Sequence, residues 1–196
     1  MKIKKIALAL LCMTAASLLF VSCSKPAPVA EAAQPSTDRI NMMINDWERA
    51  KKYTKAYLDS ANDKTIAFKL SDKTPRAFGD QLLHLAEANY GLVQAATGKA
   101  TDMGFGKLEK NEKFKTKADV SQAVMDSYDY VLAALKDMND GQLSDTVSIE
   151  LGPGFKPSMS RELMLNKAFE HQTHHRGQAT QYLRAHGLTP PQEMLF

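Results

Sequence analysis

Four long stretches with helical periodicity constrain this chain more than any other feature of its sequence. In each stretch apolar side chains recur every three or four positions, as on the buried face of an amphipathic helix. The predicted helices span residues 40–61, 75–97, 118–138 and 159–186. Residues 146–151 alternate and allow a short strand or an extended loop. Because no convincing sheet or internal repeat appears, the sequence predicts an all-α four-helix bundle.

The ends of the predicted helices carry residues typical of helix termini. Thr74 is predicted to cap the second helix and Pro75 to be its first residue, a favoured pair. Residues 98–116 join the second helix to the third, are rich in Lys and Gly, and show weak periodicity. A connection of this length predicts a crossover along the bundle rather than a tight hairpin.

The N-terminal residues have the pattern of an export signal. Residues 1–22 combine a basic start with an apolar run. The stretch Leu19-Phe20-Val21-Ser22-Cys23 resembles the lipobox of bacterial lipoproteins, with Phe20 where Leu is usual. We therefore expect lipidation at Cys23 and an exported, membrane-anchored lipoprotein facing the periplasm. An ordinary cleaved signal or a single membrane anchor is the alternative.

Composition divides the remaining chain in two and excludes several functions. Residues 23–38 are rich in Pro, Ala and Ser and are expected to form a flexible tether, which leaves 39–196 as the folded domain. Removal of the signal would lower Lys and Arg from 25 to 22, against 22 Asp and Glu. No nucleic-acid partner is expected of a chain with this neutral balance. Of the two cysteines, Cys12 lies in the predicted signal and Cys23 would carry the lipid. Any metal must therefore be held by His, Asp or Glu.

Three histidines lie close together in the last predicted helix, in the stretch HQTHHRGQ. Steps of three and four residues place His171 and His175 on the inward stripe and His174 on a polar stripe. Spacing of i and i+4 stacks the two inward imidazoles one turn apart, where they could share a metal ion. Two core histidines satisfied by hydrogen bonds are the alternative.

A third inward histidine strengthens the metal interpretation. His84 lies near the middle of the second predicted helix, at about the height of His171 in the fourth. Metal sites in bundles are built from inward side chains of facing helices at one level. A buried site of three histidines leaves coordination positions open, as catalytic metal sites do.

The C-terminal part of the chain resembles a known superfamily. The run HQTHHRGQ, followed by Tyr182-Leu183-Arg184, Gly187 and Pro190-Pro191, is similar to the C-terminal signature of the DinB-like (YfiT-like) superfamily. The resemblance implies a four-helix bundle with His84, His171 and His175 as metal ligands. It also implies metal-dependent transfer or isomerisation with small thiols such as bacillithiol or mycothiol. The signal and tether depart from the cytosolic norm of that superfamily.

The expected site determines a class of chemistry but not the reaction. A divalent ion on three imidazoles activates water or a thiol, and Zn, Ni, Cu, Fe and Mn all remain open. Gln172 stands where a metalloprotease motif has its glutamate, and spacing reveals no carboxylate base. We expect a small-molecule substrate and allow a homodimer. The alternative is a non-catalytic, tethered metal-binding bundle. Residues His174, Arg176 and Gln178 are predicted at the rim or behind the ligands, with a structural role favoured for Arg176.

Overall fold

The structure is a computed structural model, and it describes residues 35–196. The predicted export signal, the lipidation at Cys23 and most of the predicted tether lie outside the described residues. Within them, the protein is mostly helical, which agrees with the all-α prediction.

Four long helices make up most of the described chain. They are α1 (Asp38–Ser60), α3 (Phe78–Thr97), α4 (Lys117–Lys136) and α5 (Arg161–Ala185). The shorter elements are α2 (Asp63–Ile66), the 3-10 helix η1 (Asp140–Ser144), β1 (Thr146–Ser148) and β2 (Ser158–Ser160). All four predicted helices are present, each within three residues of its expected limits.

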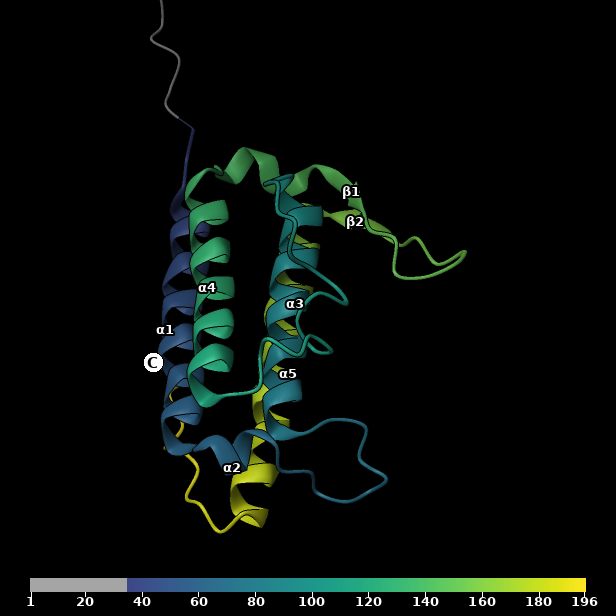
Figure 1. The fold of residues 1–196 in the computed structure, drawn as a ribbon. Helices are drawn as coiled ribbons and strands as arrows, with labels where there is room; N and C mark the ends of the chain where they lie inside the picture. Colours follow the sequence, from purple (N-terminus) through teal and green to yellow (C-terminus); the bar gives the residue numbers. More distant parts are fainter. Residues whose placement is uncertain (1–34) are drawn as a thin grey trace, which may run out of the picture. The chain divides into compact units, whose positions relative to one another are not determined.

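The long helices pack side by side. Helix α3 lies against α5 and α4, and α1 lies against α4 and α5. Figure 1 shows α1 and α5 running in one direction and α3 and α4 in the other. Because α3 and α4 run the same way, the connection 98–116 passes back along the molecule from the end of one helix to the start of the next.

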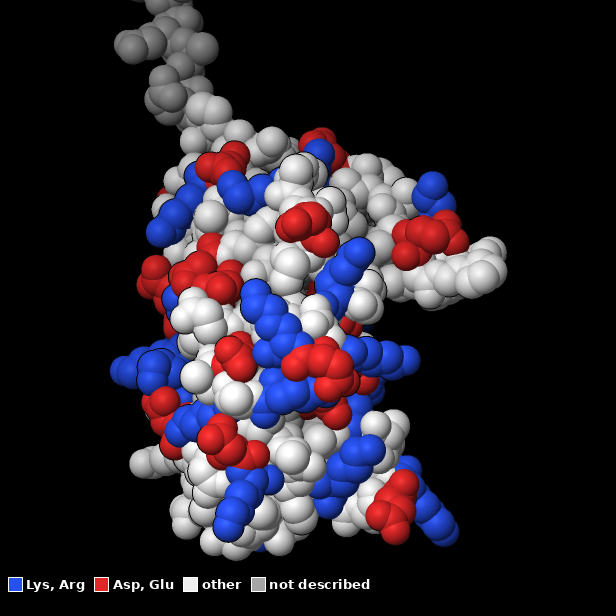
Figure 2. Space-filling view, viewed as in Figure 1, with Lys and Arg blue, Asp and Glu red and all other residues white. Residues whose placement is uncertain are grey.

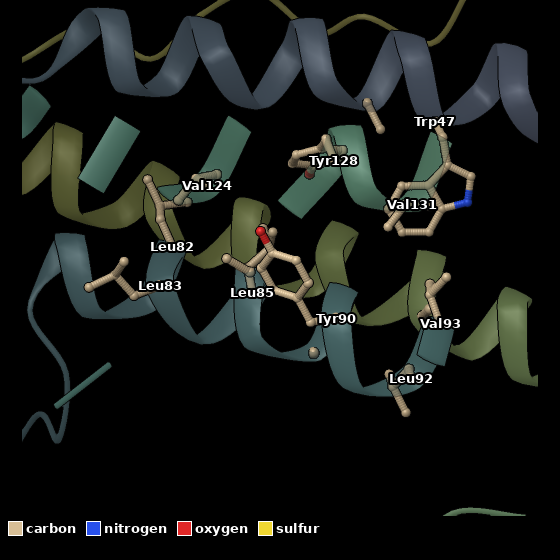
Figure 3. Packing of buried hydrophobic residues seen from close by; sticks show 14 of the residues in the cluster. Trp47, Leu82, Leu83, Leu85, Tyr90, Leu92, Val93, Val124, Tyr128 and Val131 are labelled. Atoms are coloured by element: carbon tan, nitrogen blue, oxygen red, sulfur yellow. The ribbon is translucent and has the colours of Figure 1, made fainter. Parts of the chain in front are cut away.

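The core is formed where the apolar faces of these helices meet (Figure 3). Trp47 of α1 is 1% exposed and packs edge-on against Tyr128 and Phe169, with ring centroids 5.8 and 5.3 Å away. Leu82, Leu85 and other apolar residues of α3 complete this layer. These contacts hold α3 and α5 at a fixed separation, which positions the polar residues between them.

The start of α3 differs from its prediction. The helix begins at Phe78 rather than Pro75, and the Asp80 carboxylate accepts the backbone N–H of Ala77 at 3.0 Å. Arg76 explains the delay, since its carbonyl accepts the Tyr182 hydroxyl at 2.9 Å and its side chain pairs with Glu109. Tertiary contacts at Arg76 therefore override the capping pattern that Thr74 and Pro75 suggested.

The alternating segment before α5 is a strand only in its first half. Strands β1 and β2 pair antiparallel, with Val147 opposite Met159. Residues 149–157 form the loop between them, which projects from the α3/α5 side of the molecule (Figure 1). This hairpin leads directly into α5, whose N-terminus is capped by Ser160: its Oγ accepts the Leu163 N–H at 3.2 Å.

Charges of both signs are interspersed over the face shown in Figure 2, without a large field of one sign. Over residues 35–196, no helix combines the length and the apolar character needed to cross a bilayer.

Candidate metal centre

Three histidines converge between α3 and α5. His84 comes from α3, and His171 and His175 come from successive turns of α5. Their ring centroids lie 4.4 to 5.2 Å apart, and one nitrogen of each ring lies within 4.8 Å of the others. A common ion about 2.0–2.1 Å from each nitrogen would need only a small inward shift of the rings. The histidines that the sequence predicted to face inward are thus brought together.

The ring of His84 is held from behind by a carboxylate. Its Nδ1 lies 3.1 Å from Oε2 of Glu109, in the connection 98–116. Arg76 binds the same carboxylate through Nε at 2.9 Å and Nη2 at 3.1 Å. The same Nδ1 also lies 3.2 Å from Nη2 of Arg76, so it faces this ion pair and leaves Nε2 as the His84 nitrogen on the side of the cluster. Carboxylates that fix a histidine in this way are typical of metal sites.

The ring of His175 is oriented by an amide. Its Nδ1 lies 2.8 Å from Oε1 of Gln81, one turn before His84 on α3. The Gln81 amide nitrogen donates to the Tyr182 hydroxyl at 3.3 Å, and that hydroxyl donates to the Arg76 carbonyl. Because the Gln81 nitrogen donates to Tyr182, the Gln81 oxygen is the atom that faces His175 and can only accept. Nδ1 of His175 therefore carries the hydrogen, and Nε2 keeps its lone pair.

His171 differs from the other two histidines. Its buried Nδ1 has no hydrogen-bond partner among the described residues. A buried polar atom without a partner is unfavourable by about 1–3 kcal/mol, so such atoms indicate an unmet requirement of the site. An ion shared by the three rings would give His171 a partner that the neighbouring side chains do not provide.

The protonation state of the cluster suits metal binding. Burial, reinforced by the neighbouring imidazoles, lowers the pKa of His171 to about 4 and that of His175 to about 3. Burial and then the Arg76 guanidinium also lower the pKa of His84. The three imidazoles are therefore neutral near pH 7, which is the form that coordinates a metal.

A second group of potential ligands shares His84. Glu87 and Glu109 lie on its Nδ1 side, again with ligand atoms within 4.8 Å of one another. These carboxylates already have donors, however. Glu87 accepts the backbone N–H groups of Leu108 and Glu109 at 2.7 and 2.9 Å, and Glu109 binds Arg76. The acidic pair therefore anchors the connection 98–116 behind His84, whereas the three imidazoles offer lone pairs and fit a divalent ion.

The carboxylates near the site were missed in the sequence. The i, i+3 spacing of His84 and Glu87 was a usable signal, because it places both side chains on one face of α3. Glu109 carried no such signal, since it lies in an irregular connection. Gln81 stood on the same predicted stripe as His84, but its contact with His175 depends on how α3 and α5 pack.

The three residues predicted at the rim have different positions. His174 is exposed, packs against the His175 ring at 4.9 Å between centroids, and lies 2.8 Å from the amide nitrogen of Gln178. Arg176 is 5% exposed and turns away from the histidines toward α1. There it donates to Gln172 at 2.6 Å and lies over the ring of Tyr53. Its position is structural rather than at the rim, because one residue step turns a helical side chain by about 100°.

Two clefts open onto the histidines, one on each side of His174. The first has a volume of about 470 Å³ and reaches His171 between Leu92, Phe105 and Leu151. The second has a volume of about 420 Å³ and reaches His175 past polar residues that include Gln178. The cluster is thus accessible to a small molecule from both sides.

Comparison with protein families assigns the chain to a family. A family model described as the DinB family matches residues 36–194. The chain belongs to the DinB family. The match spans the four long helices and therefore includes His84, His171 and His175. No match was found among curated proteins.

Solved structures show the same fold. A DinB-like protein from Bacillus cereus is similar with a TM-score of 0.65 and 20% identity, covering 79% of this chain and 97% of that one. A DinB-like protein from Bacillus subtilis has a TM-score of 0.59 and 17% identity, covering 80% and 97%. A conserved protein from Enterococcus faecalis has a TM-score of 0.51 and 15% identity, covering 74% and 95%. At these identities the likeness concerns the fold alone.

Proposed function

We propose that this DinB-family protein is a metal-dependent enzyme, a hydrolase or a thiol-dependent transferase, that acts on a small molecule. One observation carries the proposal: three neutral imidazoles converge with two of their Nδ1 atoms held from behind, beside clefts of about 470 and 420 Å³. A structural metal site is usually closed by protein ligands, whereas a catalytic one keeps positions open.

The proposed ligands are His84, His171 and His175. A divalent ion bound there supplies Lewis acidity, which lowers the pKa of a coordinated water or thiol and polarises a carbonyl. Glu109 and Gln81 contact Nδ1 of His84 and of His175 and so hold the two rings in place. His174 and Gln178, which contact one another at 2.8 Å, lie where a substrate would enter and offer it polar atoms.

The alternative is a non-catalytic metal-binding protein of the same fold. It is favoured by the position of the acidic residues, since Glu87 and Glu109 lie behind His84 and are engaged by other groups. Within the described residues, no carboxylate of this group faces the side of the cluster on which a substrate would lie. An enzyme with this site would rely on the activated water or thiol itself as the nucleophile.

A substrate screen separates the two functions. The purified full-length chain, loaded with zinc, nickel, iron or manganese, would be offered ester, amide and thiol-conjugation substrates. If the protein is an enzyme, turnover should disappear when the metal is chelated and in His171→Ala. It should persist in the control His186→Gln, because His186 lies outside the cluster. A binding protein retains one ion per chain and shows no turnover with any substrate class. Wild-type protein without a stoichiometric metal would contradict both functions.

We further propose that the protein is tethered to the membrane through a lipid on Cys23. The support is the lipobox-like stretch that ends at Cys23, followed by the Pro- and Ala-rich residues before α1. Labelled palmitate should be incorporated into the wild type and lost from Cys23→Ser. Unchanged labelling and membrane attachment in that variant would contradict the tether.

A further inference from the structure

Three apolar side chains from separate parts of the chain meet beside His171. Leu92 comes from α3, Phe105 from the connection 98–116 and Leu151 from the loop 149–157, and all three line the 470 Å³ cleft. We call this cleft the apolar groove. Phe105 is 44% exposed and Leu151 is 45% exposed. Scattered apolar residues are normal on a surface, but a set that faces one groove indicates a binding site.

The position of Phe105 depends on a glycine in the middle of α3. A Cβ added at Gly91 would lie 2.5 Å from Cε2 of Phe105 and 2.8 Å from its Cδ2, so the ring packs directly on the helix backbone. Glycine is unfavourable inside a helix, and here it admits a large ring that remains partly exposed. The same connection is anchored to α3 by Glu87, which accepts two of its backbone N–H groups. The apolar groove is therefore a built feature of the fold.

The charges around the apolar groove cancel. Lys167 and Glu170 of α5 stand at its edge and pair with each other at 2.7 Å. No unpaired cation or carboxylate of the described residues lines the groove. The cleft on the other side of His174 has more polar side chains in its lining, among them three glutamines and Arg76, which is paired with Glu109. An uncharged apolar group is thus the best match for the groove.

Two irregular segments, the connection 98–116 and the hairpin loop 149–157, supply two of the three apolar walls. Figure 1 shows both on the α3/α5 side of the molecule, and in Figure 2 the loop 149–157 stands out from the body of the protein above a notch. Strands β1 and β2 fix the base of that loop through their antiparallel pairing. Leu151 is therefore held beside the histidine cluster rather than far from it.

We propose that the apolar groove binds an uncharged aliphatic or aromatic group of the small molecule whose polar group lies at the three histidines. The substrates of the site are accordingly amphiphilic small molecules. This inference rests on the proposed metal function, because it uses the metal to place the polar end. Leu92, Phe105 and Leu151 act as specificity-determining residues that select the apolar end.

A series of metal-binding probes with increasing tail length tests the proposal. Straight-chain hydroxamates, from acetohydroxamate to octanohydroxamate, would be titrated by calorimetry into the cobalt-loaded full-length chain, with the visible spectrum reporting coordination. We expect affinity to rise roughly two- to fourfold for each added methylene until the groove is filled. In Leu151→Ser and Phe105→Ser this dependence should flatten while acetohydroxamate binds as in the wild type. Gly91→Ala, which displaces the Phe105 ring, should flatten it as well.

Leu163→Ser is the matched control. Leu163 is also 45% exposed, but it lies near the start of α5 and does not line the groove. The proposal is overturned if acetohydroxamate binds and longer tails bind no more tightly, or if Leu163→Ser flattens the series as much as Leu151→Ser. The metal site would stand in either case.

A metal-independent measurement keeps the two proposals distinguishable. If acetohydroxamate leaves the cobalt spectrum unchanged, the proposed metal function fails, and the groove is tested on metal-free protein with the uncharged fluorophore N-phenyl-1-naphthylamine. Fluorescence enhancement that falls severalfold in Leu151→Ser but not in Leu163→Ser supports an apolar binding groove. No enhancement with the wild type overturns it.

Discussion

Helix α5 carries two buried polar clusters on different faces, and they differ in whether their hydrogen bonds are complete. Toward α1 and α4, Gln172 accepts from Tyr128 at 2.9 Å and from Arg176 at 2.6 Å, and Tyr128 contacts Thr54 at 2.7 Å. No buried side-chain atom of these four residues lacks a partner in the described chain. Toward α3, the histidine cluster leaves Nδ1 of His171 without one.

The contrast separates a structural polar cluster from a candidate site. Thr54, Tyr128, Gln172 and Arg176, here called the α5 network, satisfy one another and need nothing further. The three histidines bring one ring nitrogen each to within 4.8 Å of the others, an arrangement that a shared cation would stabilise. Burial alone therefore does not identify a functional polar group. Asn89 Oδ1 and Arg161 Nε also lack hydrogen-bond partners in the described chain, so the unpaired His171 nitrogen indicates a site only together with the convergence of the three imidazoles.

The largest expected effect is the loss of a ligand. His175→Ala removes one imidazole, so metal affinity should fall by more than about 100-fold, beyond the range seen for outer partners of a metal site. Competition with a chelator of known affinity measures it. His174→Ala should bind the metal as the wild type does. Loss in His174→Ala with retention in His175→Ala would reverse the assignment of inward and outward histidines.

Disrupting the α5 network should change folding instead. Gln172→Leu removes the amide oxygen that accepts from both the Tyr128 hydroxyl and the buried Arg176 guanidinium, which leaves them only Thr54 Oγ1 to share. We expect the free energy of unfolding to fall by about 2–3 kcal/mol. Urea denaturation of metal-free protein measures this. The affinity of the remaining folded protein for metal should be unchanged, and a loss of affinity comparable to that of His175→Ala would mean that the two clusters act as one.

Gln81→Leu makes the same substitution on the other face. It removes the acceptor that holds His175 in place, so metal affinity should weaken by about 10–100-fold. Its effect on unfolding of the metal-free protein should be smaller than that of Gln172→Leu, because no charged group loses its partner. Equal effects of the two substitutions on both properties would remove the distinction between the clusters.

The smallest effect concerns acid stability of the metal-free protein. The pKa of His171 is lowered to about 4 and that of His175 to about 3, against about 6.5 in an unfolded chain. As pH falls below about 6.5, the unfolded chain takes up protons that the folded one refuses, so stability declines. Above that pH these groups should contribute no pH dependence. Denaturation at pH 7.5 and 5 should show a smaller decline in His175→Gln, and an identical decline would contradict the stated cause.

The sequence predicted the elements that depend on local periodicity. Helical spacing placed His171 and His175 inward and His174 outward, because one side-chain direction follows from the next along a helix. His84 was predicted as the third ligand from its height in a separate helix. That inference was possible because the helices are long and run side by side.

Features that depend on packing were not predicted. Glu109 reaches His84 from an irregular connection, and no periodicity reports where such a segment lies. Helix α3 begins at Phe78 rather than at the predicted Pro75, because Arg76 binds Glu109 and Tyr182. For Arg176 a structural role was favoured over a rim position, but its partners in the α5 network depend on how α5 packs against α1 and α4. Local patterns therefore predicted the ligands but not the groups that orient them.

X-ray absorption of the zinc-loaded protein tests the central claim most directly, since it counts imidazole ligands around the ion. We predict one zinc per chain with three imidazole nitrogens at about 2.0–2.1 Å. His171→Ala should reduce that number or abolish binding. A single imidazole with carboxylate oxygens would instead indicate His84, Glu87 and Glu109, and it would contradict the assignment of the metal to the three histidines.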